Sequence, residues 1–329
     1  MSTARSRRQR GFTFIEIVVS LAVLTLLALA VERTLTSAKD NERYLTAIRR
    51  ATERGQQTCY EVFRTVSASR KLFQDDTLGQ GYLDALNVTR LPMAGDSRLP
   101  IIDEVGELGP DAIGDPMTGN VLLFVEENDP APCVADGAAG KLRYIDTYRF
   151  VCVYRTGTTV NLVTGSPDAT DLVIWRSVPY PNRAQIAAIE DADELRDVVV
   201  DLVDRYGYDT AWDPGAPVES GFFALSPTGV LAGTASTVPV IDEDVDRTTL
   251  GRLVAAQVQL APTNEDAPHR KAIFTVDEPQ VWSPNGFEVK IAGASGSRRV
   301  WIHLVVESPA GGGRVAVHPS TMIASTRDL

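Results

Sequence analysis

The longest apolar run in the chain lies at its N-terminus. Between Phe12 and Val31, 20 residues include a single ionisable one, Glu16. As an α-helix this segment is about 30 Å long, which matches the hydrocarbon thickness of a bilayer. Residues 1–10 carry four arginines and no acid. Because basic flanks stay on the cytoplasmic side, the pattern predicts a single-pass topology with residues 32–329 on the far side of the membrane.

Residues 32–73 extend the helical pattern and are predicted to form an amphipathic spine. They contain no Pro and only one Gly, Gly55. Small and apolar positions recur every three or four residues and trace one face. A continuous helix over 12–73 is about 93 Å long. The apolar members of the face gather in the C-terminal half, where we expect a head to pack; they are Leu45, Ile48, Cys59, Val62, Val66 and Phe73.

The remainder of the chain is dominated by strand patterns. Residues 74–119 are rich in Gly, Pro and Asp and predict an irregular loop. One helix is predicted at 191–205, with Asp191 as N-cap and Glu194 completing a capping box. The order of elements predicts an α+β fold, in which a long N-terminal helix packs on a mostly antiparallel β head with an inserted helix. β-Branched and aromatic runs predict strands at 121–125, 141–155, 159–163, 171–178, 221–225, 253–261, 272–276, 287–291 and 300–307, with 315–318 as a weaker candidate.

Composition and charge narrow the functional classes. The 329 residues include 32 Lys and Arg against 43 Asp and Glu, for a net charge of −11. An acidic chain lacks the basic surface that sequence-independent nucleic-acid binding needs, so no nucleic-acid partner is predicted. Charge also divides along the chain, with a net +4 in residues 32–73 and −18 in residues 74–329. Solubility of an exported domain is the preferred explanation for the acidic head.

Gly11, Phe12 and Glu16 form a pattern at the start of the apolar run. Residues 8–16 read RQRGFTFIE. This stretch resembles the class III signal of type IV prepilins and type II secretion pseudopilins, in which a basic leader ends in Gly, Phe follows, and Glu lies four residues after that Phe. The resemblance covers residues 5–31. It implies cleavage between Gly11 and Phe12 by a membrane-embedded prepilin peptidase, and N-methylation of Phe12.

The resemblance also gives Glu16 a role in assembly. A carboxylate inside a bilayer costs roughly 2.5–3.5 kcal/mol, so Glu16 either reaches the headgroups or finds a cationic partner. In pilin-like filaments the partner is the freed amine of Phe12 on a neighbouring subunit. The implied domains are a leader (1–11), a transmembrane segment (12–31), the spine (32–73) and an exported acidic head (74–329). The implied partners are the prepilin peptidase, other pilin or pseudopilin subunits, an inner-membrane assembly platform and the lipid bilayer.

These features predict a structural subunit of a type IV pilus or a type II secretion pseudopilus. A head of 256 residues favours a low-copy or tip position, as in a minor pilin or minor pseudopilin. The protein is expected in the inner membrane with a periplasmic head, and at the cell surface once a filament assembles. The alternative is a membrane-anchored or secreted binding or adhesion module that does not polymerise. Cleavage by ordinary signal peptidase at residues 28–30 would release such a protein from Val31 onward.

The sequence offers little catalytic chemistry. Its three histidines lie far apart, and the common hydrolase, zincin and phosphate-loop motifs are absent, so no enzymatic activity and no catalytic residue is predicted. His303 is expected on the outward face of a strand. Asp242, Asp244 and Asp246 are a weak calcium candidate, because the run lacks the Gly and the later Glu of an EF-hand loop. A solvated acidic loop is the preferred interpretation, so no cofactor is expected.

The sequence does not decide which of the three cysteines form a disulfide bond. Cys133 and Cys152 are 19 residues apart in a compartment expected to be oxidising, and they are the candidate disulfide. Cys59 would then remain a small apolar residue on the buried face of the spine. A bond from Cys59 to either of the others, joining spine to head, is the alternative.

Overall fold

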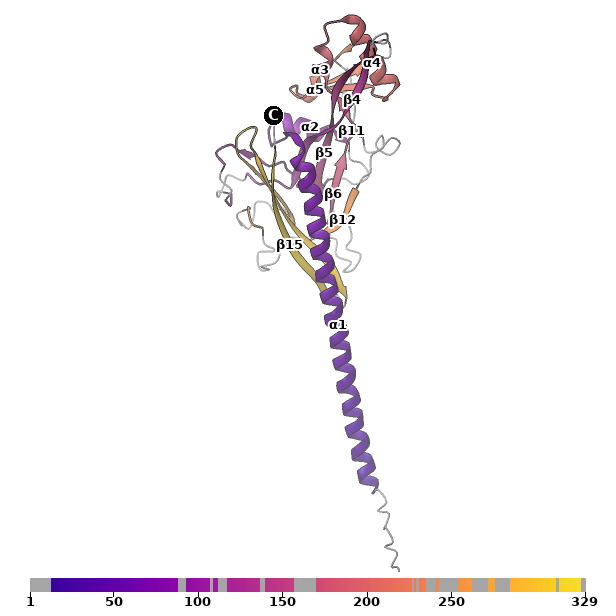
Figure 1. The fold of residues 1–329 in the computed structure, drawn as a ribbon. Helices are drawn as coiled ribbons and strands as arrows, with labels where there is room; N and C mark the ends of the chain where they lie inside the picture. The colour runs from indigo at the N-terminus through magenta and orange to yellow at the C-terminus, as the bar shows by residue number, and fades with distance from the viewer. Residues whose placement is uncertain are drawn as a thin grey trace, which may run out of the picture.

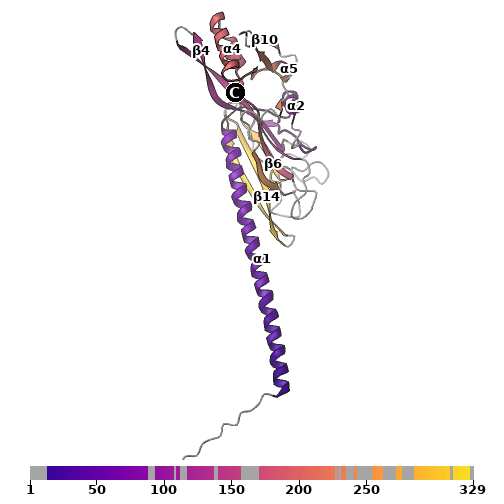
Figure 2. The same ribbon diagram turned by 90° about the vertical axis from the view of Figure 1, so that its right-hand side faces the viewer.

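The computed structural model shows one long helix that carries a β-rich head on its C-terminal half. Helix α1 (Phe14–Ser67) projects from the head by its N-terminal half (Figures 1 and 2). The predicted α+β class is confirmed. The residues described are 13–87, 93–106, 109–111, 117–136, 140–156, 170–226, 228, 231–234, 241–242, 254–261, 272–275, 285–311 and 314–326.

Helix α1 ends earlier than its sequence pattern suggests. Its 54 residues make a rod about 81 Å long, and the predicted spine boundary at residue 73 was wrong. After Ala68 the chain enters strand β1 (Ser69–Leu72), which pairs antiparallel with β4 (Val121–Asp136). Phe73 continued the 3–4 spacing, but it is buried beyond β1 in an aromatic core. Pairing with β4 supplies the backbone hydrogen bonds of residues 69–72, so these residues form a strand although their apolar positions follow helical spacing.

The head is built on a ten-stranded sheet. Its order is β1-β4-β5-β6-β12-β14-β13-β3, with β15 on the free side of β14 and β7 on β5. Apart from the short parallel pair of β3 and β13, its strand pairs are antiparallel. The strands besides β1 and β4 are β3 (Ile102–Asp103), β5 (Lys141–Arg155), β6 (Thr170–Arg176), β7 (Tyr180–Pro181), β12 (Val254–Leu260), β13 (Phe287–Ala292), β14 (Arg299–Gly311) and β15 (Arg314–Ser325).

Most predicted strands are confirmed, but some are longer than predicted. The pattern located β4, β5, β6, β9 (Phe222–Leu225), β12, β13, β14 and β15, but β4 and β15 run much further than predicted. Strand β4 passes through Pro130 by means of a register shift between Asn128 and Ala131. The strand predicted at 272–276 was wrong for the residues described, because 272–275 form bends. The strand predicted at 159–163 lies outside the described residues.

The central strands of the sheet are buried on both faces. Helix α1 covers one face, mainly over β14 and β15, and its residues Val62 and Val66 join an aliphatic core with side chains of eight strands. The opposite face, over β4, β5 and β6, carries an aromatic core that includes Phe150, Trp175 and Trp212. Along β4, β5 and β6, alternation therefore sends side chains into two different cores, which explains why these strands read as nearly continuous apolar runs.

The contact between α1 and β15 is made by small side chains. Ala47 and Ala51 of the helix are buried, and Ala47 packs with Ala316 of β15. At Gly55 the approach is closest, because a Cβ built there would lie 2.8 Å from the hydroxyl of Ser320. Small residues therefore set the distance between helix and sheet.

Gly55→Leu should separate the helix from the sheet. The added side chain has no room beside Ser320, so the free energy of unfolding should fall by about 1–3 kcal/mol. Gln57→Leu places the same side chain on the exposed side of α1 and serves as the control. Thermal unfolding followed by circular dichroism measures the difference. Equal unfolding temperatures for the two variants would contradict the packing described here.

The region predicted as irregular contains a helix. Helix α2 (Thr77–Asp84) begins at Asp76, whose carboxylate accepts a hydrogen bond of 2.7 Å from the amide of Gly79. A Cβ at Gly79 would lie 2.0 Å from the carbonyl oxygen of Gln74, so a glycine is required there. Glycines that indicated a loop thus permit close packing, and they bring Tyr82 into the aromatic core.

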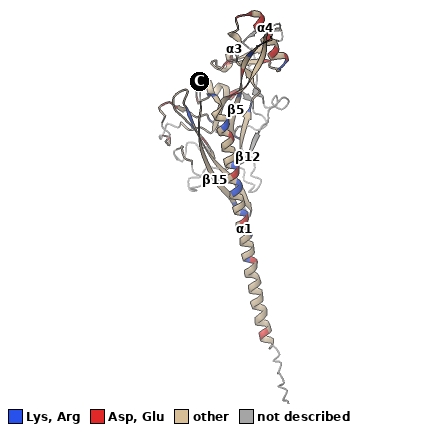
Figure 3. Cartoon of the chain, in the orientation of Figure 1, with Lys and Arg blue, Asp and Glu red and all other residues tan. Residues whose placement is uncertain are grey.

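The end of the head far from the start of α1 forms a distal lobe. It consists of residues 126–136 and 140–146 of the β4–β5 hairpin and residues 183–225, and it has its own apolar core. The predicted helix at 191–205 is confirmed as α4 (Ala192–Asp204), with Asp191 accepting from the amides of Asp193 and Glu194. The Glu194 carboxylate turns to Arg143 of the hairpin, 2.6 Å away. Acidic residues gather on α4 (Figure 3).

Short elements complete the lobe and connect it to the sheet. Tyr82 donates to the carbonyl of Ala216 at 2.9 Å and accepts from Trp212 Nε1 at 3.0 Å, so α2 and the lobe share one polar contact inside the aromatic core. The other short elements are α3 (Arg183–Ala187), α5 (Val218–Gly221), β8 (Thr210–Trp212), β10 (Leu231–Thr234) and the parallel pair β2 (Leu86–Asn87) with β11 (Ile241–Asp242).

Candidate processing and assembly site

Helix α1 begins with a capping box. The Thr13 amide donates to Glu16 Oε2 at 2.8 Å, and the Thr13 hydroxyl donates to the same oxygen at 2.9 Å. In return, the Glu16 amide donates to Thr13 Oγ1 at 3.4 Å. A Thr at the N-cap with Glu three residues later satisfies amides that have no partner within the helix. The carboxylate of Glu16 therefore lies against the backbone at the residue that follows Phe12.

The first part of α1 is exposed along its length. Residues 14–46 are all exposed, including large apolar side chains such as Phe14, Leu21 and Leu29. Among the described residues, α1 is the one helix with the length and composition to cross a membrane, and its most apolar 18-residue window has a mean hydropathy of 2.7. Exposing this many apolar side chains to water is unfavourable, so the segment requires an apolar environment.

The predicted processing residues adjoin this segment. Gly11 and Phe12 lie outside the described residues, and Glu16 lies in the first turn of α1. Cleavage, N-methylation and the pairing of Glu16 in assembly therefore stay predictions. The capping box gives Glu16 a local partner that the sequence analysis did not predict, although Thr13 and Glu16 stand at capping-box spacing.

The predicted disulfide between Cys133 and Cys152 is absent. All three cysteines are free. On the β4–β5 hairpin, Cys133 lies opposite Arg143 and Cys152 lies opposite Leu123. Ten residues of strand separate these positions, about 33 Å at 3.3 Å per residue, which no disulfide spans.

Cys59 also has no cysteine partner. It lies in the aliphatic core, Cys152 lies in the aromatic core across the sheet, and Cys133 lies in the distal lobe. Burial raises the pKa of the Cys59 and Cys133 thiols to about 12, and it raises the pKa of Cys152 as well. The thiolate, which is the reactive form, is therefore scarce at all three positions, and the cysteines act as small apolar residues.

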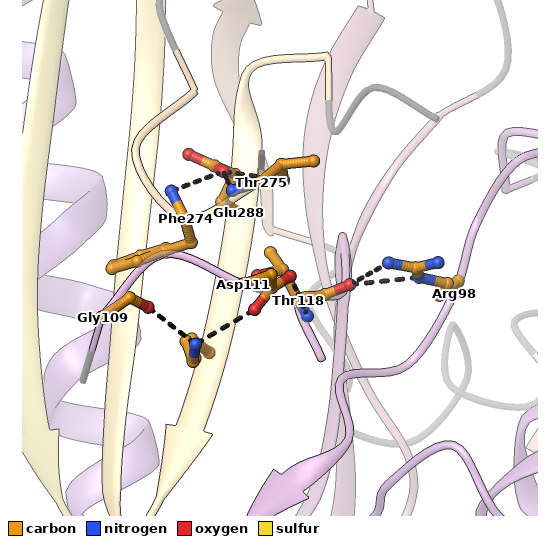
Figure 4. Close-up of polar contacts among 8 residues, drawn as sticks. Arg98, Gly109, Asp111, Thr118, Phe274, Thr275 and Glu288 are labelled. Carbon is orange, nitrogen blue, oxygen red and sulfur yellow. Dashed lines mark hydrogen bonds and ion pairs between the residues drawn. The ribbon is translucent and has the colours of Figure 1, made fainter. Parts of the chain in front are cut away.

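A buried ion pair lies on the face of the sheet opposite α1. Lys290 of β13 contacts Asp111 with 3.0 Å between Nζ and Oδ1, and the two side chains are only 4% and 2% exposed (Figure 4). Lys290 also donates to the carbonyl of Gly109 at 2.7 Å, and the amide of Thr118 donates to Asp111 Oδ2 at 3.0 Å. Both charges are thus compensated by hydrogen bonds as well as by each other.

Glu288, two residues before Lys290, binds a second loop. Its carboxylate accepts hydrogen bonds from the amides of Ile273, Phe274 and Thr275 at 2.9–3.2 Å, and from the Thr275 hydroxyl at 3.0 Å (Figure 4). Phe274 stacks on Trp301 with ring centroids 5.3 Å apart. The alternate polar residues of β13 therefore hold residues 109–111 and 272–275 against the sheet.

Sequence patterns did not identify this cluster. Glu288 and Lys290 alternate with apolar residues, which is typical of a solvated strand face, and their partners lie far away in the chain. His303 was expected on an outward face, but it is buried, and its Nδ1 lies 2.8 Å from the Thr321 hydroxyl. The same loops that bury Glu288 cover this face, and strand periodicity alone cannot reveal them.

The described residues contain no cluster of three or more His, Cys, Asp or Glu side chains able to hold a metal. Of the calcium candidate, Asp242 lies in β11, and Asp244 and Asp246 lie outside the described residues. Calcium binding there stays a weak prediction.

Lys290→Met should destabilise the head strongly. The substitution leaves the Asp111 carboxylate buried without its cation, which typically costs about 3–5 kcal/mol of unfolding free energy. Lys290→Met combined with Asp111→Leu removes both charges and should recover most of that loss. Urea unfolding of the two variants beside the parent protein measures both effects. A double variant no more stable than the single one would show that the two charges are not coupled.

Comparison with known proteins adds one finding at the N-terminus. Residues 6–31 match the family model described as the prokaryotic N-terminal methylation motif. Neither the search of curated proteins nor the search of solved structures found a significant match. The motif spans the leader, the capping box with Glu16, and the exposed apolar part of α1. The N-terminal segment is therefore a methylation motif of the prepilin class III type, which supports a pilin- or pseudopilin-type precursor.

Proposed function

We propose that the protein is a low-copy structural subunit of a type IV pilus or a type II secretion pseudopilus. The observation that carries this proposal is the continuity of α1, which joins the N-terminal methylation motif to the core of the head without interruption. One half of the helix is apolar and exposed, and the other half is part of the folded head. A cleaved signal peptide would need no such continuity, because its helix is discarded.

The geometry suits a subunit that is first inserted in a membrane and then packs its N-terminal helix against the helices of other subunits. The exposed segment 14–31 supplies about 27 Å of apolar helix, close to the thickness of the bilayer core. The same surface, brought against apolar helices of other subunits, keeps its side chains out of water in a filament. The inner membrane, a cytoplasmic N-terminus, a periplasmic head and an assembly platform as partner all belong to this proposal.

Leader removal changes the charge next to Glu16. Cleavage after Gly11 by the prepilin peptidase frees an amine on Phe12, one residue before the Thr13 amide that contacts the Glu16 carboxylate. Because Phe12 adjoins Thr13 in the chain, we expect the freed amine to pair with Glu16 of its own chain or of a neighbouring subunit. Pairing with a neighbour compensates two charges inside an apolar helix bundle, and this supports a role for Glu16 in recruitment.

The size of the head supports a low-copy position. The ten-stranded sheet lies to one side of α1, and the distal lobe extends beyond the C-terminal end of the helix (Figure 2). Subunits that repeat at short axial spacing leave little room for such a head, whereas a tip or a sparse position does not restrict it. The methylation motif favours a structural role over catalysis.

The mass of the mature N-terminus tests this proposal. A protein that begins at N-methylated Phe12 is the expected result. A Gly11→Leu variant should keep its leader and its full-length mass, because the bulky side chain obstructs the peptidase. An intact Met1 in the parent protein would indicate a plain membrane anchor, and a start at Val31 would indicate a secreted module. Either result would overturn the proposal.

Glu16→Val should give a protein that is cleaved and inserted but not recruited. The substitution removes the carboxylate without affecting the Gly11–Phe12 bond, and it leaves the buried half of α1 unchanged. Recruitment should fall at least about tenfold, which corresponds to a loss of 1.4 kcal/mol, and Glu16→Asp should have a smaller effect. Thr13→Ala, which weakens only the capping box, is the matched control. Quantitative mass spectrometry of isolated filaments measures recruitment, and normal levels of Glu16→Val would contradict the pairing.

A further inference from the structure

In the part of the chain that the structure describes, strand β15 lies at an edge of the sheet. Its 12 residues pair with β14 from Arg314 opposite Gly311 to Ser325 opposite Arg299. Among the residues that the structure describes, no strand pairs with its other side. A long edge strand presents a row of backbone donors and acceptors, and proteins usually shorten, cover or interrupt such edges.

The direction of each backbone group in β15 follows from its partner strand. The Val305 amide donates to Gly286, and its carbonyl accepts from Ala261, so both groups of Val305 point away from β15. Val305 lies opposite Pro319. In an antiparallel pair such a position is not hydrogen-bonded, so the backbone groups of Pro319 point to the outer edge. The backbone N–H and C=O groups of the odd-numbered residues of β15 therefore point to the outer edge of the sheet.

Pro319 divides the outer edge into two parts. It has no N–H to offer, so the outward row of donors is interrupted in the middle of the strand. On the side of the distal lobe, the outward amides belong to Thr321, Ile323 and Ser325. The structure gives these three amides no hydrogen-bond partner among the described residues, and their side chains are exposed. This half of the edge is the part free to accept another strand.

Helix α1 restricts what approaches the edge. Ile48 packs with Ala316 of β15, and Leu45, one turn earlier on the same side of the helix, is 65% exposed. The opposite side of the helix turns toward β6, where Glu61 pairs with Arg176 at 3.8 Å. Since Gly55 lies beside Ser320 and the two elements run in the same direction, the part of α1 beside residues 321–325 lies beyond Gly55. On this side it carries Gln56 and Phe63, and neither is charged. A strand added beside β15 would therefore meet an uncharged helix surface.

We propose that residues 321–325 of β15 accept an extended, uncharged segment of a different subunit by backbone pairing. This rests on the proposed function, because it requires a partner anchored in the same membrane. Antiparallel pairing between two copies is the alternative, but β15 runs in the same direction as α1, since Arg43 lies beside Gly311 and Gly55 beside Ser320. Two β15 strands paired antiparallel would point their membrane anchors in opposite directions.

Hydrogen exchange resolved to single amides tests the pairing. The mature full-length chain purified in detergent is compared with the same chain in isolated filaments. The amides of Thr321, Ile323 and Ser325 should exchange rapidly in detergent and at least about tenfold more slowly in filaments. The inward amides of Met322 and Ala324, which bond to β14, should be slow in both samples.

Two variants separate the backbone from the side chain. Ile323→Pro removes one outward N–H and leaves the bonds to β14, so its incorporation into filaments should fall about tenfold at an unchanged unfolding temperature. Ile323→Ala removes the side chain but keeps the N–H, and it should be incorporated normally. If Ile323→Pro unfolds, the exchange measurement on the parent chain still decides.

Each outcome bears on a different claim. Rapid exchange of the three outward amides in filaments that contain the protein would overturn the strand pairing and leave the proposed function intact. Slow exchange already in the purified chain would indicate pairing between copies and would also overturn it. Absence of the mature protein from every filament preparation would overturn the proposed function together with this inference.

Discussion

The close packing of α1 on β14 and β15 is the contact on which the rest of the structure depends. Ala47, Ala51 and Gly55 let the helix lie directly on the sheet, and Val62 and Val66 extend the contact into the aliphatic core. Without the helix, one face of the ten-stranded sheet would expose a row of aliphatic side chains to water. The helix that emerges from the membrane signal is thus also the structural centre of the head.

Local patterns in the sequence predicted what depends on periodicity and end signals. The apolar run, the methylation signal, helix α4 with its Asp191 cap and most of the strands were found in this way. The same reasoning failed where long-range contacts decide the local structure. Phe73 continued the helical spacing, but pairing of β1 with β4 places it beyond a strand. Gly79 indicated a loop, although it is the residue that permits α2 to pack.

The functional positions also divide into those that a local motif identified and those that depend on long-range contacts. Glu16 was identified because it is the one ionisable residue of the apolar run and lies four residues after Phe12, within a short local motif. The Lys290–Asp111 pair was missed because its members are 179 residues apart and each follows an unremarkable local pattern. The disulfide between Cys133 and Cys152 was wrong for a related reason. In a hairpin, the register of the two strands decides which residues lie opposite each other. The number of residues between two cysteines does not reveal that register.

The parallel course of α1 and β15 determines how the head bears mechanical load. In the proposed filament, force would enter through the N-terminal segment of α1 and act along the axis of the helix. Since Arg43 lies beside Gly311 and Gly55 beside Ser320, the helix and the strand run side by side in the same direction. An axial pull therefore loads their contacts in shear, all at once, and does not peel them apart one by one. A head attached through a flexible linker would transmit no such force, and one attached across the strands would yield contact by contact.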